Sequence, residues 1–268
     1  MLEGHVHPDF RKVAEVFVQQ LPHKAPGGAA LCVYHRGERV VDIWGGTRDR
    51  EGTPWQADTL SLSFSTTKGI VSTLLHILAD QGLVDYNAPV AEYWPAFAQN
   101  GKGHITVRHL LCHEAGLYPI RSLIKDASEM RDWAHMLEVM EQSAPIHTPG
   151  KRNGYHALTY GWLVGGLVEK VAGKPLAKVL KKELADPLQL DGCFIGVPKK
   201  EVERCAKLIV PERKPRQPSA EKRAPKKISL TQRVIEGGLR ATGFEPNTTL
   251  EGMVPRGMAH FDWNAPEL

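Results

Sequence analysis

A serine and a lysine stand three residues apart at the start of an apolar stretch. Ser65 and Lys68 lie within Ser63–Ile70, and the apolar segment Val71–Ala79 follows directly. If this stretch is helical, the lysine amine lies one turn from the serine on the same face and is able to take its proton. Burial and nearby positive charge favour the neutral amine that this role needs. The spacing therefore points to a nucleophilic serine primed by a lysine.

The predicted helix start is a second reason to consider catalysis. Unpaired backbone N–H groups and the positive end of the helix dipole favour the negative charge that develops when Ser65 attacks an acyl group. Two simpler explanations stand beside this one. A serine that begins a helix is often only an N-cap. The S-x-x-K spacing also occurs by chance, as in Ser122–Lys125, which no comparable apolar helix follows.

Other residues with chemical potential are less well placed. His109 and His113 have the spacing of zinc ligands and Glu114 follows, but the order is not H-E-x-x-H and no third ligand is evident. The four cysteines include no C-x-x-C pair, which signals neither a zinc site nor a disulfide framework. We therefore expect structural histidines, no metal and no cofactor.

Length and composition indicate an ordinary globular protein. The 268 residues are 42% hydrophobic, which is enough for one large domain or two closely joined lobes. No run approaches the roughly 18 apolar residues of a membrane span, and the first residues lack a basic region followed by an apolar stretch. These features predict a cytoplasmic protein with no membrane partner.

The net charge of +4 is unevenly distributed along the chain. Residues 199–233 hold twelve Lys and Arg against four Glu, so the rest of the chain is acidic. The centre of this segment, residues 211–227, has four prolines and no large apolar residue, which predicts an exposed loop. Nucleic acid is disfavoured as a partner, because no aromatic residues for base stacking are interleaved with the charges.

Apolar periodicity predicts the elements in the first third of the chain. A helix is expected over residues 7–21, followed by two strands, Ala30–His35 and Arg39–Trp44, that form a hairpin. The serine helix should then run to about residue 81 and stop at Gly82, a residue type that favours helix ends.

Helices are expected through the middle of the chain. Thr106 should cap one, the apolar spacing in Trp133–Met140 predicts another, and Gly173 should end a third. The polar loop Pro149–Ala157 precedes the third helix and presents Tyr155. Three glycines in that helix allow close packing against another element; they are Gly161, Gly165 and Gly166.

These residues together resemble the serine β-lactamase and penicillin-binding-protein superfamily, most of all its class C branch and the family VIII carboxylesterases. The resemblance spans roughly residues 28–195. It implies a catalytic set in which Ser65 is acylated, Lys68 assists its deprotonation and Tyr155 relays a proton to the leaving group. The matching stretches, in order, are Ser65–Lys68, Thr106–Leu117, Pro149–Tyr155, and Gly173–Leu176 leading to Pro187–Leu188.

Two departures from the family pattern bear on the expected activity. Class C enzymes have asparagine two places after the tyrosine, where this chain has Ala157, and this favours ester over β-lactam hydrolysis. The third family motif, a Lys, His or Trp shortly before Gly on an edge strand, has no convincing copy, and Gly257–Trp263 is not one. We therefore expect a C-terminally truncated chain with weak or absent turnover. Its exposed sheet edge would allow pairing with a second copy.

The resemblance implies an α+β fold like that of β-lactamases and DD-peptidases, with an antiparallel sheet flanked by helices, an all-helical lobe, and C-terminal sheet strands missing. A sheet lobe is expected at residues 1–82, a helical lobe with a helix over 175–184 at 83–198, the basic loop at 199–233, and a return to the sheet lobe at 234–268. The expected function is a serine carboxylesterase acting on small esters through an acyl-enzyme. A β-lactam or peptide amide hydrolase, or a non-catalytic binding protein on the same fold, are the alternatives.

Overall fold

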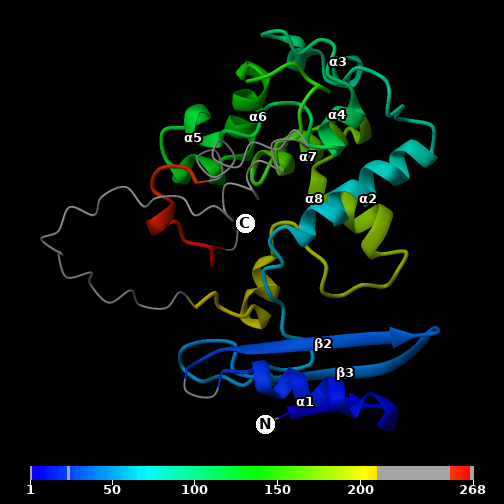
Figure 1. The fold of residues 1–268 in the computed structure, drawn as a ribbon, viewed down its shortest axis with the longest axis vertical. Helices are drawn as coiled ribbons and strands as arrows, with labels where there is room; N and C mark the ends of the chain where they lie inside the picture. Colours follow the sequence, from blue (N-terminus) through cyan, green and yellow to red (C-terminus); the bar gives the residue numbers. More distant parts are fainter. Residues whose placement is uncertain (1, 23–24, 210–253, 266–268) are drawn as a thin grey trace, which may run out of the picture.

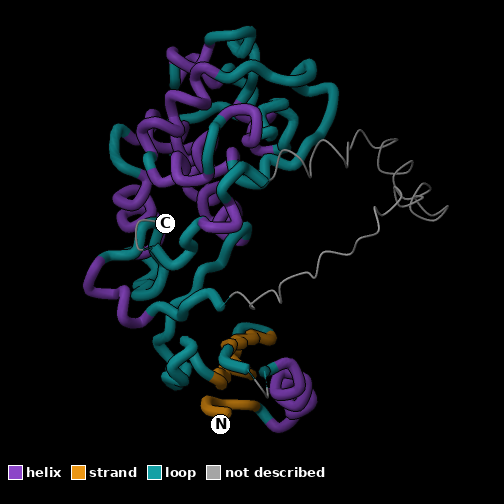
Figure 2. Tube along the Cα trace, turned by 90° about the vertical axis from the view of Figure 1, so that its left-hand side faces the viewer, coloured by secondary structure: helices purple, strands orange, loops and turns teal. Residues whose placement is uncertain are grey.

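The computed structural model describes residues 2–22, 25–209 and 254–265, and it has two parts (Figure 1). A small sheet with one helix lies at one end, and a larger helical body lies at the other. Figure 2 shows the strands gathered beside a single helix, away from the remaining helices. The segment that leads out of the sheet runs directly into the serine helix.

The sheet has three antiparallel strands in the order β1–β3–β2. They are β1 (Leu2–Val6), β2 (Gly28–His35) and β3 (Glu38–Gly46). The predicted hairpin between β2 and β3 is confirmed. Its turn residues Arg36 and Gly37 have positive φ angles of 52° and 86°, which match the tight two-residue turn that strand twist favours.

Helix α1 (Arg11–Gln20) lies on one face of the sheet, and a 3-10 turn at Pro8–Phe10 precedes it. The predicted first helix is therefore confirmed except at its ends. Strand β1 was not predicted, because Gly4 and its polar neighbours form no β-rich run; antiparallel pairing with β3 determines it. The buried apolar side chains between helix and sheet are Phe17, Val40, Val41 and Ile43.

The helical body is built on two long helices, α2 (Thr66–Asp80) and α7 (Thr159–Ala172). Shorter helices surround them: α3 (Val90–Tyr93), α4 (Val107–Leu111), α5 (Ile120–Leu123), α6 (Trp133–Gln142) and α8 (Leu176–Leu180). Short 3-10 turns occur at Pro95–Ala98, Ala127–Arg131, Lys199–Arg204 and Met258–His260, and a π-helical turn at Lys181–Ala185 extends α8. Among the described residues, none of these helices is long and apolar enough to cross a membrane.

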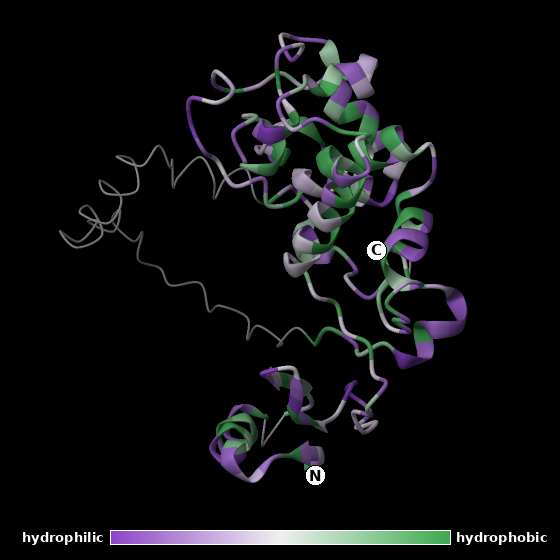
Figure 3. Ribbon diagram, turned by 90° about the vertical axis from the view of Figure 1, so that its right-hand side faces the viewer, coloured by the Kyte–Doolittle hydropathy of each residue, from purple (hydrophilic) through white to green (hydrophobic). Residues whose placement is uncertain are grey.

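Helices α2 and α7 pack together in the main apolar core, and apolar segments gather within this body (Figure 3). Gly165 and Gly166 allow the close approach that the sequence predicts, since a Cβ would lie 2.8 Å from the side chain of Leu176 and 2.7 Å from that of Leu137, respectively. The prediction is wrong for Gly161, where a Cβ would meet nothing within 4 Å. The buried side chains of α2 follow the spacing of one helix face; they are Val71, Leu74, Leu75 and Leu78. Core packing therefore fixes the helix that begins after Ser65.

Two predicted helix boundaries are confirmed by their caps. The Thr106 side chain accepts a hydrogen bond from the backbone N–H of His109 (3.3 Å) and begins α4. Gly173 ends α7 in the left-handed conformation, with φ 63°. These two caps fix the start of α4, which precedes the Tyr155 loop, and the end of α7, which follows it.

Two segments pack differently from the expected grouping into lobes. Helix α2 was grouped with the sheet, but its apolar face packs against α7 in the helical body. Residues 254–265 were expected to rejoin the sheet lobe. They lie against the helical body instead, where the N–H of Ala127 donates to the carbonyl of Arg256 (2.7 Å). Met258 and Phe261 pack on the main core, so apolar contact explains this position.

The basic segment 199–233 is described only at its start. Lys199–Arg204 forms a 3-10 helix where a loop was expected, because Arg204 has several acceptors close by, among them the Glu201 carboxylate at 2.7 Å. The prolines and cations at residues 211–227 lie outside the described residues. The lobe boundaries themselves stay a prediction.

Candidate active site

The Ser65 hydroxyl does not cap helix α2, although the residue stands at its N-cap position. Ser65 has φ −68° and ψ −11°, and its side chain makes no capping hydrogen bond. N-cap residues that bind the helix with their side chain ordinarily have extended backbone angles. The preceding Phe64 has φ 47°, in the left-handed region that non-glycine residues avoid. The N-cap explanation therefore does not account for this serine.

The amine of Lys68 lies beside the Ser65 hydroxyl, as their spacing predicts. Its Nζ donates to Ser65 Oγ (3.1 Å) and to the carbonyl oxygen of Ala157 (2.6 Å). One acceptor is at the start of α2 and the other is in the loop before α7, so the amine links α2 to the loop that leads into α7. A nitrogen at this distance is within reach for proton transfer with the serine.

Tyr155 lies on the other side of the serine. Its hydroxyl donates to Ser65 Oγ (2.9 Å), and Lys68 Nζ lies 5.0 Å from the centroid of its ring. The neighbouring Gly154 anchors the loop, because its N–H donates to the carbonyl of His113 (2.9 Å). The fold thus brings together all three residues predicted to form the catalytic set, although Tyr155 is 90 positions from Ser65.

Two histidines that were not assigned to the site lie behind Tyr155. The His113 ring packs edge-on against the tyrosine ring, with centroids 4.9 Å apart. Its Nδ1 accepts the backbone N–H of His156 (3.1 Å), and His156 Nε2 accepts the backbone N–H of Leu117 (3.1 Å). Because each ring accepts at one nitrogen, both imidazoles are held in the neutral form.

Burial strengthens this preference for neutral imidazoles. It lowers the pKa of His156 to about 3, with His113 as a further cause, and it lowers the pKa of His113 to about 4, with the Lys68 charge as a further cause. The pair therefore supports the Tyr155 ring without adding positive charge. The sequence alone gave little indication of this pair. His113 lies in a stretch shared with the family, and His156 directly follows Tyr155.

An apolar cavity of about 370 Å³ opens beside Ser65. Its size is in the range of about 300–1,000 Å³ that is usual for small-molecule sites. Tyr160 lines it, and its hydroxyl is paired with Ser72 Oγ (2.6 Å) while burial raises the pKa of the phenol. The apolar lining includes Leu60, Leu62, Phe64, Val71, Leu158 and Phe194. This lining suits an uncharged, apolar group next to the serine.

Comparison with known proteins identifies the family. The sequence matches the Beta-lactamase family over residues 13–243, which is most of the chain. The chain belongs to the Beta-lactamase family. Ser65, Lys68 and Tyr155 all lie within the matched span.

Relatives of this family member include esterases. The chain is 44% identical over 211 residues to "Esterase/beta-lactamase LipL" of Mycobacterium tuberculosis, a match that covers 78% of this chain and 48% of the relative. It is 31% identical to "Esterase EstB" of Burkholderia gladioli, covering 71% of this chain and 52% of the relative. The chain therefore spans about half the length of these curated relatives.

Solved structures of the same fold are also similar. A family VIII carboxylesterase aligns with a TM-score of 0.72 at 36% identity, covering 78% of this chain and 57% of the other. A penicillin-binding protein homologue from Caulobacter crescentus aligns with a TM-score of 0.72 at 35% identity, covering 80% and 57%. These similarities confirm the predicted β-lactamase-like fold, with mixed helices and a small antiparallel sheet, over the matched part.

The remaining chemical candidates from the sequence are engaged in other contacts. In the second S-x-x-K copy, Ser122 Oγ donates to the carbonyl of Pro119 (2.8 Å). His109 belongs to the cap of α4, where its Nδ1 accepts the N–H of Thr106 (3.2 Å). Within the ranges that the structure describes, no group of three or more His, Cys, Asp or Glu is arranged to hold a metal ion.

Proposed function

We propose that this member of the Beta-lactamase family is a serine hydrolase that cleaves small esters through a covalent acyl-enzyme. Ser65 is the nucleophile, Lys68 assists its deprotonation, and Tyr155 passes a proton to the leaving group. The supporting observation is that Lys68 Nζ and Tyr155 OH converge on Ser65 Oγ, at 3.1 and 2.9 Å. An activated serine needs a proton acceptor within such a distance.

Acylation in this proposal is a balanced exchange of bonds. Ser65 Oγ attacks the ester carbonyl carbon while its proton passes to the lysine–tyrosine pair, and the alcohol leaves with a proton returned by Tyr155. The positive end of the α2 dipole favours the negative charge on the carbonyl oxygen. The N–H groups of Thr66, Thr67 and Lys68, in the first turn of α2, already donate to the carbonyls of Ser63, Phe64 and Ser65. Water then attacks the acyl-enzyme along the same proton path, which releases the acid and restores Ser65.

An ester is favoured over a β-lactam by the residue that holds the lysine. Ala157 accepts the Lys68 hydrogen bond with its backbone carbonyl (2.6 Å), and its methyl side chain offers no amide group where class C enzymes carry asparagine. The names of the relatives support the same order, since EstB is called an esterase and LipL an esterase and β-lactamase. Hydrolysis of β-lactams is therefore the second candidate.

The test has two parts. A fluorophosphonate probe labels a reactive serine covalently, and a chromogenic short-chain ester reports acylation by the release of colour. Intact mass spectrometry should show one adduct, mapped to Ser65, and the Ser65→Ala variant should lose it. Ser122→Ala is a matched control because it changes the serine of the second S-x-x-K copy, and it should label normally.

Two results would contradict this function. An adduct that persists in Ser65→Ala would place the nucleophile elsewhere. An unaltered chain that forms no adduct would favour a non-catalytic binding protein on the same fold. A chromogenic cephalosporin in the same assay compares the two hydrolase candidates, since faster opening of the β-lactam than of the ester would reverse their order.

A further inference from the structure

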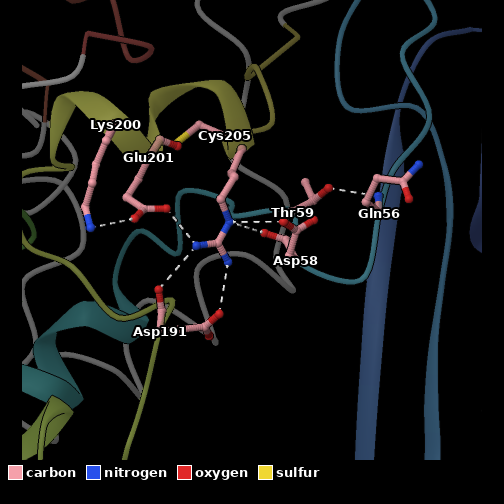
Figure 4. Close-up of polar contacts among 8 residues, drawn as sticks. Gln56, Asp58, Thr59, Asp191, Lys200, Glu201 and Cys205 are labelled. Atoms are coloured by element: carbon pink, nitrogen blue, oxygen red, sulfur yellow. Dashed lines mark hydrogen bonds and ion pairs between the residues drawn. The ribbon is translucent and has the colours of Figure 1, made fainter.

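Arg204 connects three segments of the chain with one guanidinium group. Its Nη1 donates to the Glu201 carboxylate (2.7 Å), its Nε donates to the carbonyl of Asp58 (3.0 Å), and its Nη1 also reaches the carbonyl of Asp191 (3.4 Å). The carboxylates of Asp58 and Asp191 each lie 3.4 Å from the same group. Figure 4 shows Asp58, Asp191 and Glu201 converging on it.

Backbone hydrogen bonds fasten the same segments beside the arginine. The N–H of Leu60 donates to the carbonyl of Arg204 (2.9 Å), and the N–H of Ala206 donates to the carbonyl of Leu60 (2.7 Å). This short parallel pairing holds the segment around Leu60, which continues into Ser65. The position of the nucleophile's leading segment is therefore tied to the position of residues 204–206.

All three segments that Arg204 joins form one side of the cavity beside Ser65. The lining residues that they contribute are Leu60, Gly192, Phe194, Val202, Cys205 and Ala206. The Arg204 and Glu201 side chains are only 21% and 15% exposed, so their ion pair is less screened by water than an ordinary surface pair. A planar guanidinium can bind several acceptors in fixed directions, which a lysine ammonium cannot reproduce.

The cavity is placed to hold the acyl part of a substrate. Tyr155, which would pass the proton to the leaving alcohol, is not among the residues that line it, whereas Ser65 and Lys68 are. The alcohol therefore leaves on the Tyr155 side of the serine, and the acyl chain remains on the cavity side. The lining is mostly apolar, with Lys68 and Lys207 at its charged positions, and it favours an alkyl chain.

We propose that Arg204 is a positioning residue that holds the wall of an acyl-chain pocket together, so that the site prefers esters of straight apolar acids. This inference rests on the proposed function. It assigns the preference to a residue that has no contact with the serine and lies outside the three-residue catalytic set. Loosening the wall would admit water beside the acyl chain and reduce the gain from each added methylene.

The test measures acylation of Ser65 by nitrophenyl esters from acetyl to hexanoyl, as the burst of nitrophenolate with the adduct confirmed by mass. In the unaltered chain each added methylene should raise the acylation rate up to about fourfold, the gain expected for a buried methylene. Arg204→Lys should reduce this gain to less than about twofold while the acetyl ester keeps most of its rate. Glu201→Gln should give a smaller change in the same direction.

Arg39→Lys is the matched control. Arg39 binds Asp42 at 2.7 Å with the same three-residue spacing as Arg204 and Glu201, but on the exposed sheet hairpin. It should leave the chain-length profile unchanged. The melting temperature of each variant shows whether a slower reaction reflects loss of folded protein or a change in acyl-chain selectivity.

The outcomes distinguish the two levels of inference. If the unaltered chain forms no Ser65 adduct, the proposed function fails and the acyl pocket fails with it. If Ser65 is acylated but Arg204→Lys keeps the full gain per methylene, or slows all esters by one common factor, the role of Arg204 is rejected and the proposed function stands.

Discussion

At the scale of single residues, Ser65 Oγ accepts hydrogen bonds from both of its partners. Lys68 and Tyr155 each donate to it, at 3.1 and 2.9 Å. Attack on an ester requires the serine proton to move to one of these groups, which must first have lost its own. If either the Lys68 amine or the Tyr155 phenol has lost one proton, that group can accept the proton of Ser65. Both groups contact the same serine oxygen, so the proton can be passed between them through it. The proposed mechanism therefore depends on both partners.

The Tyr155 hydroxyl gives the most direct test of this dependence. Tyr155→Phe keeps the ring against His113, where the centroids lie 4.9 Å apart, and removes only the donor to Ser65. We expect acylation by a nitrophenyl ester to slow about 10²- to 10⁴-fold, the usual contribution of a positioned acid–base group, with little change in melting temperature. Stopped-flow release of nitrophenolate measures the rate.

Tyr86→Phe is the control for this change. The Tyr86 hydroxyl bonds to His76 Nδ1 (2.8 Å) near the C-terminal end of α2, at the opposite end of that helix from Ser65. Its removal should leave acylation unchanged. A Tyr155→Phe rate within a few fold of the unaltered chain would mean that Lys68 alone activates the serine.

The buried histidine pair predicts a pH dependence of stability. The pKa of His113 falls from 6.5 to about 4 in the folded chain and that of His156 falls from 6.5 to about 3, both chiefly through burial. Below pH 6.5 the unfolded chain therefore binds protons that the folded chain does not. Stability should be full above pH 6.5 and fall as pH decreases toward 3, by up to about 1.4 kcal/mol per pH unit for each histidine.

Urea unfolding at pH 7, 6, 5 and 4 measures this fall in the free energy of unfolding. His113→Gln should be less stable at pH 7 but should lose less stability on acidification, because one of the two groups is gone. The exposed His104 supplies the control, since His104→Gln should follow the pH profile of the unaltered chain. Equal slopes in all three proteins would show that the pair does not govern acid stability.

At the scale of elements, local chemistry in the sequence predicted the helix ends and the hairpin. Thr106 and Gly173 carry the capping and left-handed roles of their residue types, and the turn at Arg36 and Gly37 follows from a glycine between two β-rich runs. Strand β1 was missed because it depends on pairing with β3. The 3-10 helix Lys199–Arg204 was missed because Arg204, at its end, also bonds to residues far away in the sequence, among them the carbonyl of Asp58.

In the candidate site too, local sequence predicted only the residues that are close together in the chain. Ser65 and Lys68 were predicted from their spacing, because one helical turn relates them. Tyr155 was predicted through the family resemblance, since no local rule connects positions so far apart. The contact of His113 with His156 required the fold, in which the positive φ of His113 (60°) turns the chain back toward the loop.

The loop that carries Tyr155 is positioned by a glycine, which gives a prediction at this scale. A Cβ on Gly154 would lie 1.9 Å from Cε1 of Tyr118, whose side chain is buried. Gly154→Ala must therefore shift the loop, and overpacking of this kind costs about 1–3 kcal/mol. We expect Ser65 labelling by a fluorophosphonate to slow at least about tenfold, because Tyr155 moves with the loop.

Gly69→Ala is the matched glycine change. A Cβ on Gly69 meets nothing within 4 Å, and the residue lies in α2, where alanine is favoured over glycine by about 1 kcal/mol. This variant should be more stable and should label normally. Normal labelling of Gly154→Ala would instead show that the loop tolerates displacement.

At the scale of the whole molecule, the described chain has two separate apolar clusters. The larger one lies in the helical body and the smaller one lies between α1 and the sheet. Hydrogen bonds join the two parts where the N–H of Lys207 donates to the carbonyl of Arg48 (2.7 Å), close to the segment that leads to Ser65. Pairing of the sheet edge with a second copy of the chain stays a prediction.

Two clusters of unequal size predict two levels of protection against hydrogen exchange. Helix α7 buries Leu163, Val164, Leu167 and Val168 in the larger cluster, so its amides should exchange slowest, and those of β1 and β2 should exchange faster through local opening. Phe17→Ala removes the α1 side chain of the smaller cluster. It should speed exchange in the sheet and leave α7 unchanged, because the two clusters share no buried residue. Mass spectrometry of exchanged peptides tests this: equal acceleration in α7 and β3 would show that the sheet and the helical body unfold as one unit.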